Sequence, residues 1–197
     1  MLDAKMTVLS LESESDANGN ITYGWLPYHD TWGTYELKQM RNIFSAVALG
    51  ARTVELTLRK QPISLDNSIF RGERQLYITQ IDDTADPHFT TVTAALLDPV
   101  SCTAEIESFE KNELNRIVSS GFRTIIFPAW LTEKYLGRTQ AEPQVVLDMM
   151  YVLITPKAIK LAAGELVTVE GKTYTVYVAH TLDGHKNEYE ISRKDEA

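Results

Sequence analysis

The chain has few of the features that mark secreted, membrane-spanning or disulfide-bonded proteins. Its 197 residues include one cysteine, Cys102. No disulfide can form within the chain, which predicts synthesis in a reducing compartment. The longest apolar run, near residues 145–154, is interrupted by Asp148 and is too short to span a bilayer. No basic segment followed by an apolar stretch opens the sequence, so we expect no signal peptide.

Positive charge is also scarce. The chain has 19 Lys and Arg residues against 27 Asp and Glu residues, a formal net charge of -8. No basic block is present that could neutralise phosphates, and this disfavours conventional DNA or RNA binding. An acidic surface can still lie beside DNA if its role is to let the DNA slide past without sticking.

Motifs for catalysis and metal binding are missing as well. The sequence has no paired cysteines, no H-E-x-x-H, no Gly-rich phosphate loop and no G-x-S-x-G elbow. His180 and His185 are five residues apart, and Asp183 is the only local candidate for a third metal ligand. The acidic residues at 82–86 lack the spacing of an EF-hand, which favours a solvated loop. We therefore expect no catalytic residue, no metal site and no cofactor.

What the sequence does contain is alternation of apolar and polar residues. The clearest case is Arg52 to Lys60, where Val54, Leu56 and Leu58 point to one face and polar residues point to the other. This pattern is typical of a half-buried antiparallel strand. Further strands are predicted at residues 6–11, 21–28, 75–81, 88–97, 122–127 and 144–154, and in a second β unit within 157–193.

Two segments have the spacing of helices instead. Apolar residues from Leu37 to Val47 recur at helical intervals, and Gly50 could be the C-cap. Ser101 or Thr103 could cap a second helix ending at Gly121, with its apolar stripe formed by Ile106, Phe109, Leu114 and Ile117. Residues 128–143 are predicted to be a connector.

The order of elements is approximately repeated. Residues 63–65, a turn at Gly72, a strand, an Asp-rich loop and another strand are echoed by residues 159–161, a turn at Glu170–Gly171, a strand, the Asp183–Gly184 loop and a last strand. The echo favours two small β modules, residues 1–100 and 101–197, over one large catalytic domain. Internal duplication and chance recurrence of β-meander patterns both explain it.

The three tryptophans lie in turn-like or connecting segments. Trp25, Trp32 and Trp130 are therefore candidates either for plugs in the core or for anchors in an interface.

The first half of the chain, about residues 5–98, resembles the head-tail joining proteins of tailed bacteriophages, also called head-closure, head-completion or stopper proteins. In that family a Trp-Ala or Trp-Gly step precedes a Glu, a Thr-rich strand ends in Arg, and a Gly-bearing turn leads into a Tyr-x-Ile strand. Trp32–Gly33, Glu36, Arg59 and Gly72 match this pattern. Leu76 stands where the Tyr is usual, and the second half departs from the family, whose members are about half as long.

The resemblance implies a mainly β (α+β) fold: a small antiparallel β-barrel with a short helix, followed here by a second small β-rich module. It also implies a ring in the neck of the virion, commonly a dodecamer, between the portal or adaptor and the tail. Such a ring retains packaged double-stranded DNA, docks the tail and has no enzymatic activity or membrane partner. The alternatives are a tail terminator or other neck ring, and a small hydrolase or carbohydrate-binding module with an acidic cleft. The candidate interface residues are Trp25, Trp32, Glu36, Arg59, Ile69, Phe70 and Trp130.

Overall fold

The structure of the protein is a computed structural model that describes residues 2–38, 53–111, 115–133, 150–181 and 184–193. Twelve strands and no helix are found in these residues. The strands are β1 (Ala4–Ser15), β2 (Ile21–Leu37), β3 (Thr53–Arg59), β4 (Ser68–Arg71), β5 (Arg74–Asp82), β6 (Phe89–Leu96), β7 (Val100–Lys111), β8 (Ile117–Glu133), β9 (Met150–Pro156), β10 (Leu166–Val169), β11 (Lys172–Thr181) and β12 (Lys186–Arg193).

The strands close into two antiparallel barrels of six strands each. In barrel 1 the order is β1-β4-β5-β6-β3-β2, and pairing of β1 with β2 completes the circle. In barrel 2 the order is β7-β10-β11-β12-β9-β8, and pairing of β7 with β8 completes it. The antiparallel barrel expected from the sequence is thus confirmed. Closure gives every strand of each barrel a neighbouring strand on both sides along part of its length.

Barrel 2 repeats barrel 1 strand for strand. The strands of barrel 1 are 12, 17, 7, 4, 9 and 8 residues long, and those of barrel 2 are 12, 17, 7, 4, 10 and 8. Their pairings follow the same order, so the echo of elements in the sequence corresponds to a repeated architecture. That each half folds as a separate unit, with a boundary near residue 100, stays a prediction.

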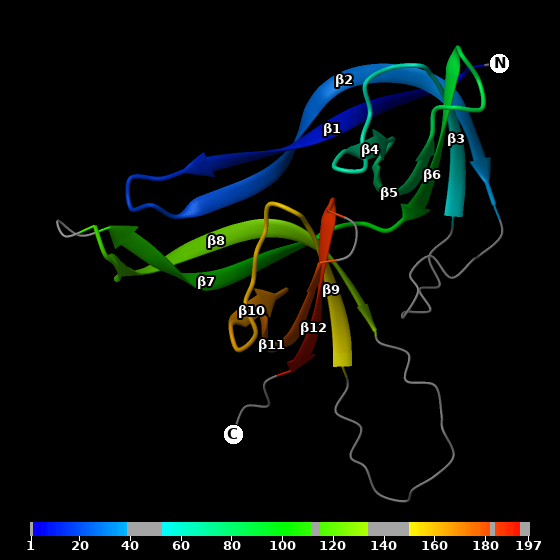
Figure 1. Cartoon of the computed structure of the whole chain (residues 1–197). Helices are drawn as coiled ribbons and strands as arrows, with labels where there is room; N and C mark the ends of the chain where they lie inside the picture. Colours follow the sequence, from blue (N-terminus) through cyan, green and yellow to red (C-terminus); the bar gives the residue numbers. More distant parts are fainter. Residues whose placement is uncertain (1, 39–52, 112–114, 134–149, 182–183, 194–197) are drawn as a thin grey trace, which may run out of the picture.

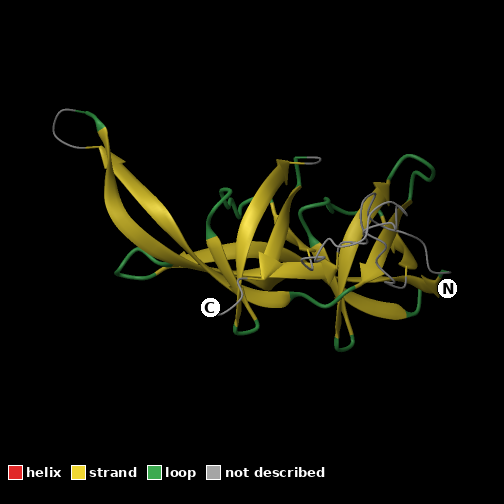
Figure 2. Ribbon diagram, turned by 90° about the horizontal axis from the view of Figure 1, so that it is seen from below, coloured by secondary structure: helices red, strands yellow, loops and turns green. Residues whose placement is uncertain are grey.

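Each barrel carries a long hairpin that extends beyond it. Arm 1 (residues 10–27) is the outer part of the β1–β2 hairpin, and arm 2 (residues 106–111 and 115–123) is the outer part of the β7–β8 hairpin. The two arms run beside each other and point the same way (Figures 1 and 2). Arm 1 therefore reaches from barrel 1 across to barrel 2, whereas arm 2 reaches away from both.

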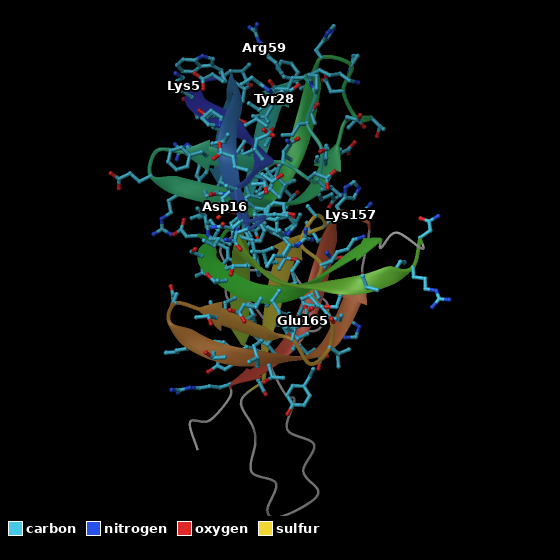
Figure 3. All side chains as sticks on the ribbon, turned by 90° about the vertical axis from the view of Figure 1, so that its left-hand side faces the viewer. Lys5, Asp16, Tyr28, Arg59, Lys157 and Glu165 are labelled. Carbon is cyan, nitrogen blue, oxygen red and sulfur yellow. The ribbon has the colours of Figure 1, made fainter. Side chains whose placement is uncertain are left out.

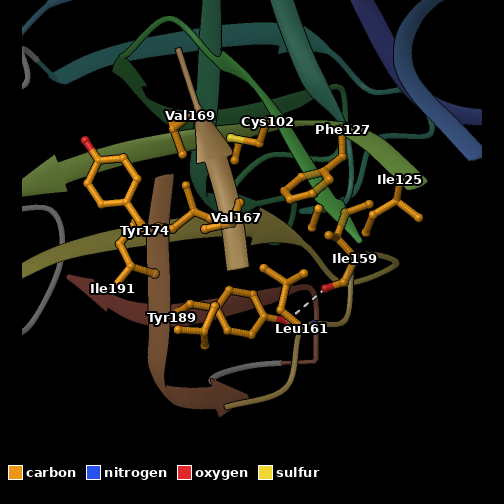
Figure 4. Packing of buried hydrophobic residues seen from close by; sticks show 14 residues of the cluster. Cys102, Ile125, Phe127, Ile159, Leu161, Val167, Val169, Tyr174, Tyr189 and Ile191 are labelled. Carbon is orange, nitrogen blue, oxygen red and sulfur yellow. Dashed lines mark hydrogen bonds between the residues drawn. The ribbon is translucent and has the colours of Figure 1, made fainter. Parts of the chain in front are cut away.

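Each barrel has its own core of alternating inward-facing residues. In barrel 1 the core includes Met6, Leu56 and Ile78. In barrel 2 it includes Phe127, Val167 and Ile191 (Figure 4). The Tyr189 hydroxyl donates to the Ile159 carbonyl oxygen at 2.9 Å and so holds the loop before β10 across the mouth of barrel 2. Two-residue turns at Gly72 and at Glu170–Gly171, with φ of 63° at Gly72 and 79° at Gly171, join the short strands as the sequence predicted.

The predicted helix between Ser101 or Thr103 and Gly121 is wrong. Residues 100–111 form β7 and residues 117–133 form β8, which pair along their whole length. Cys102 and Ala104 face the core while Ser101 and Glu105 face solvent, so the period is two and not 3.6. The predicted connector at 128–143 is also partly wrong, because Pro128–Glu133 continues β8. The helix expected from Leu37 to Gly50 lies almost wholly outside the described residues.

Gly33 is a position of barrel 1 where a side chain would not fit. A Cβ there would lie 2.6 Å from the Thr57 carbonyl oxygen and 2.5 Å from Leu58 Cδ2. We expect Gly33→Ala to lower the free energy of unfolding by about 1–3 kcal/mol in urea titrations, because the barrel wall must move. The matched control is Gly24→Ala in the same strand, where a Cβ meets nothing within 4 Å. Equal effects of the two substitutions would contradict this packing.

Burial raises the pKa of the Cys102 thiol to about 12, with a smaller contribution from the Glu170 carboxylate. The unfolded thiol loses its proton at a lower pH than the folded one. Stability should therefore fall as the pH rises from about 9 toward 12, and Cys102→Ala should remove this component of the pH dependence. We also expect slow labelling of native protein by a thiol reagent at pH 8 and fast labelling in denaturant. Rapid labelling of the native thiol would disprove its burial.

Candidate assembly surface

The outer wall of barrel 1 carries two exposed aromatic side chains. Trp32 in β2 is 52% exposed and Phe70 in β4 is 40% exposed. They flank β1, where Lys5 pairs with Trp32 and Thr7 pairs with Phe70 in the sheet register. Lys5 Nζ lies 2.8 Å from Asp30 Oδ2 in an exposed ion pair (Figure 3 labels Lys5). Exposed aromatic side chains are enriched in contact surfaces, whereas Lys and Asp are depleted there.

The ion pair has a measurable electrostatic signature. The hydrogen bond from Lys5, and next that from the Thr7 hydroxyl at 2.7 Å, hold the pKa of the Asp30 carboxyl below its usual value. The pair is solvated, so it contributes little to stability. Its effect is to fix the charged side chains between the two aromatic groups.

The other predicted interface residues are dispersed. Glu36 and Arg59 are exposed, at the far ends of β2 and β3, and Glu36 bonds Lys38 at 2.9 Å. Ile69 is fully buried in the core of barrel 1, so it cannot touch a partner. The segment from Asp66 to Arg71 includes β4, which pairs with both β1 and β5 and is part of the barrel wall.

Trp25 and Trp130 lie between the two barrels. The Trp130 ring is 4.5 Å from that of Tyr77 and 6.1 Å from that of Trp25, centroid to centroid. Its indole Nε1 donates to the Leu97 carbonyl oxygen at 3.1 Å. Lys186 of barrel 2 adds a hydrogen bond to the Ile78 carbonyl oxygen at 3.0 Å. These contacts form an aromatic plug that joins the barrels.

Arm 1 completes the junction. Ile21 and Tyr23 pack against the core of barrel 2. Ile21 and Thr22 of β2 pair in parallel with Ile125 and Ile126 of β8. The Thr124 amide donates to Asn20 Oδ1 at 3.0 Å. The apolar face of arm 1 therefore packs on barrel 2. We call this contact between the two halves of one chain the seat of arm 1.

The sequence analysis missed the apolar surface of arm 2. Phe122 is 75% exposed and Ile117 is 70% exposed, the two largest values among the exposed large apolar side chains of the described residues. The sequence had placed Ile117 in a helix stripe and Phe122 in a buried strand. The echo began at residue 63; extended to residues 21–37 and 117–133, it would have matched Ile117 with Ile21, which packs against the core of barrel 2.

Polar clusters in the described residues have structural roles. Asp82 Oδ1 accepts hydrogen bonds from the Thr84 and Ala85 amides at 3.0 and 3.3 Å, which lower the pKa of this carboxyl and form a turn. His185 Nδ1 lies 3.1 Å from Asp66, and His180 Nε2 lies 3.5 Å from Glu190. Within the described ranges no three His, Cys, Asp or Glu side chains are placed to hold a metal ion. No helix long and apolar enough to cross a membrane occurs there.

Among the comparisons with known proteins, the one with solved structures gave a match. No family model matches the chain, and no curated protein matches it. A solved chain of the virion of a native gene transfer agent particle is similar, with a TM-score of 0.37 and 13% identity. The match covers 49% of this chain and 94% of that chain.

The aromatic plug can be separated from the outer wall by mutation. Trp130 is 3% exposed, so Trp130→Ala should leave a cavity and lower the free energy of unfolding by about 3–5 kcal/mol. Trp32→Ala, on the exposed wall, should change it by less than about 0.5 kcal/mol. Denaturant titration of the two variants checks this. A larger loss for Trp32→Ala would place Trp32 in the core instead.

Proposed function

We propose that this protein is a structural connector in the neck of a tailed-phage-like particle. In this proposal it forms a ring between the portal or adaptor and the tail, keeps the packaged DNA in place and docks the tail. It acts through surface contacts and carries out no chemical reaction. A tail terminator is the second candidate, because a ring at the tail end needs the same kind of contact surfaces.

The observation that carries the proposal is the seat of arm 1 in barrel 2. A barrel that buries the apolar face of its hairpin in a neighbouring barrel is a unit suited to joining barrels in series. Such contacts are heterologous, with a different surface on each side, and a heterologous contact that closes produces a ring.

The residues that resemble the head-tail joining family lie at structurally coherent places in barrel 1. Trp32 is on the outer wall and Gly33 is on the inner side of the same strand, where no side chain fits. Arg59 ends β3 and Gly72 forms the turn between β4 and β5. The residues that match therefore define the barrel and its outer wall, which are the parts that the proposed role uses.

The charge of the chain suits a channel for DNA. A formal net charge of -8 gives a ring whose surface repels phosphates. A basic ring would instead hold the genome through release of counterions. We therefore expect double-stranded DNA to pass without sequence-specific binding.

Deleting the gene in the particle-producing strain tests this function. We expect electron micrographs to show heads that are filled with DNA or leaking it, and separate tails. The wild-type gene should restore joining of heads to tails. The Trp130→Ala gene should not restore it if that variant unfolds. Complete joined particles without this protein would refute the connector role. Heads that stay joined to tails of abnormal length would favour the tail terminator.

A further inference from the structure

The seat of arm 1 has a structural counterpart at the other end of the molecule. We propose that arm 2 docks on barrel 1 of a second copy of this chain, in the way that arm 1 docks on barrel 2 within one chain. The inference deepens the proposed function, and it rests on the self-association which that function requires. It assigns the surfaces on both sides of the contact.

The first reason is the equivalence of the two arms. Across arm 1, Leu11 lies opposite Trp25 and Ser15 opposite Ile21, and this face is turned to barrel 2. Because β1 and β7 have equal lengths, as have β2 and β8, the matching residues of arm 2 can be identified. There Glu107 lies opposite Phe122 and Lys111 opposite Ile117.

The same face thus carries large apolar side chains from the second strand of both arms, but they are covered in only one. In arm 1, Ile21 and Trp25 are half-buried against barrel 2. In arm 2, Phe122 and Ile117 are exposed to solvent. Burying both side chains would remove their apolar surface from water, which favours association.

The second reason is the matching receptor surface on barrel 1. Arm 1 meets Thr124 of β8, whose amide donates to Asn20 Oδ1, and the core of barrel 2, against which Ile106 of β7 also packs. In the register that matches Glu107 with Leu11, Ile106 corresponds to Ser10 and Thr124 corresponds to Pro27, the neighbour of the bulge residue Tyr28.

Tyr28 and Ser10 line an open hollow of about 440 Å³, together with Ile63 and Ser64. Tyr28 is 58% exposed. Figure 3 shows it on the part of barrel 1 away from barrel 2, while Asp16 at the tip of arm 1 lies close to barrel 2. The Tyr28 side of the hollow is therefore the side that a second copy could approach, whereas Ser10 on the other side also lines a second hollow with Pro156 and Lys157 of barrel 2.

The third reason is an equivalent strand edge. Thr22 pairs with Ile126 in the seat of arm 1. Val118 in arm 2 corresponds to Thr22, and Asp30 in β2 corresponds to Ile126. Val118 and Asp30 are both exposed.

Within the described ranges, β1 is the one strand that pairs with β2 at Asp30, and on the side away from β1 the Gln61 side chain bonds the Thr31 hydroxyl and the His29 ring. A parallel partner like that of β8 would pair with β2 beside this side chain. The contact is head-to-tail, because arm 2 and barrel 1 are different surfaces of each copy.

Disulfide trapping between full-length chains tests the register directly. Val118→Cys protein is mixed with Asp30→Cys protein and oxidised, and we expect a covalent dimer in the mixture at least tenfold above either protein alone. Cys102 is fully buried and does not compete. A chain carrying both Thr22→Cys and Ile126→Cys should form the internal bond and serves as the positive control. Tyr177→Cys, also on an exposed residue, mixed with Asp30→Cys is the negative control.

A second measurement uses variants that should still fold. Phe122→Asp and Ile117→Asp change exposed side chains, as does the control Tyr177→Asp. Sedimentation velocity at high concentration should show oligomers for wild type and Tyr177→Asp, and at least a tenfold weaker association for the other two. Rings that persist in Phe122→Asp and trap no Val118–Asp30 dimer would overturn the inference and leave the connector role intact. A wild-type chain that never self-associates, even in particles, would contradict both.

Discussion

The rest of the structure depends on covering the apolar face of a projecting hairpin. A closed six-stranded barrel satisfies its own backbone, but its arm carries Leu11, Tyr23 and Trp25 on one side and has no core of its own. In water this face is unfavourable, so it must be buried against something. Within the chain, barrel 2 buries it. The orientation of the two barrels, the parallel pairing of β2 with β8 and the aromatic plug at Trp130 are all consequences of that burial.

Repetition then turns a local requirement into a rule for assembly. The second barrel has the same strand order and an arm of the same length, so it presents the same need at its free end. The two arms are not identical: the bulge lies at Tyr28 in β2 and at Ser120 in β8. At the positions of Leu9 and Leu11 in the first half, the second half has Glu105 and Glu107. These differences are suited to a contact that forms reversibly between chains and not permanently within one.

Much of the barrel could be predicted from the sequence, and much of the surface could not. Period-two patterns such as Val54, Leu56 and Leu58 identify strands because barrel walls have one buried face. Ile106 and Ile117 misled, since a hairpin with a bulge can place apolar residues at helical intervals by chance. Burial of Ile69 and Trp130 depends on strands distant in sequence, and no local pattern predicts it. No local pattern shows that Phe122 is exposed. Its counterpart Trp25 is covered by side chains distant in sequence, so the difference between the two residues appears only when the structures of the two halves are compared.

The most direct measurement of the central claim is a high-resolution image of the assembled protein by electron cryomicroscopy. If arms join barrels in series, the rotation and shift that relate barrel 1 to barrel 2 in one chain will recur between barrel 2 and barrel 1 of the next. The assembly will then contain two nearly equivalent barrels for each chain, with Phe122 buried. An assembly whose chains meet through other surfaces, with arm 2 in solvent, would contradict the account.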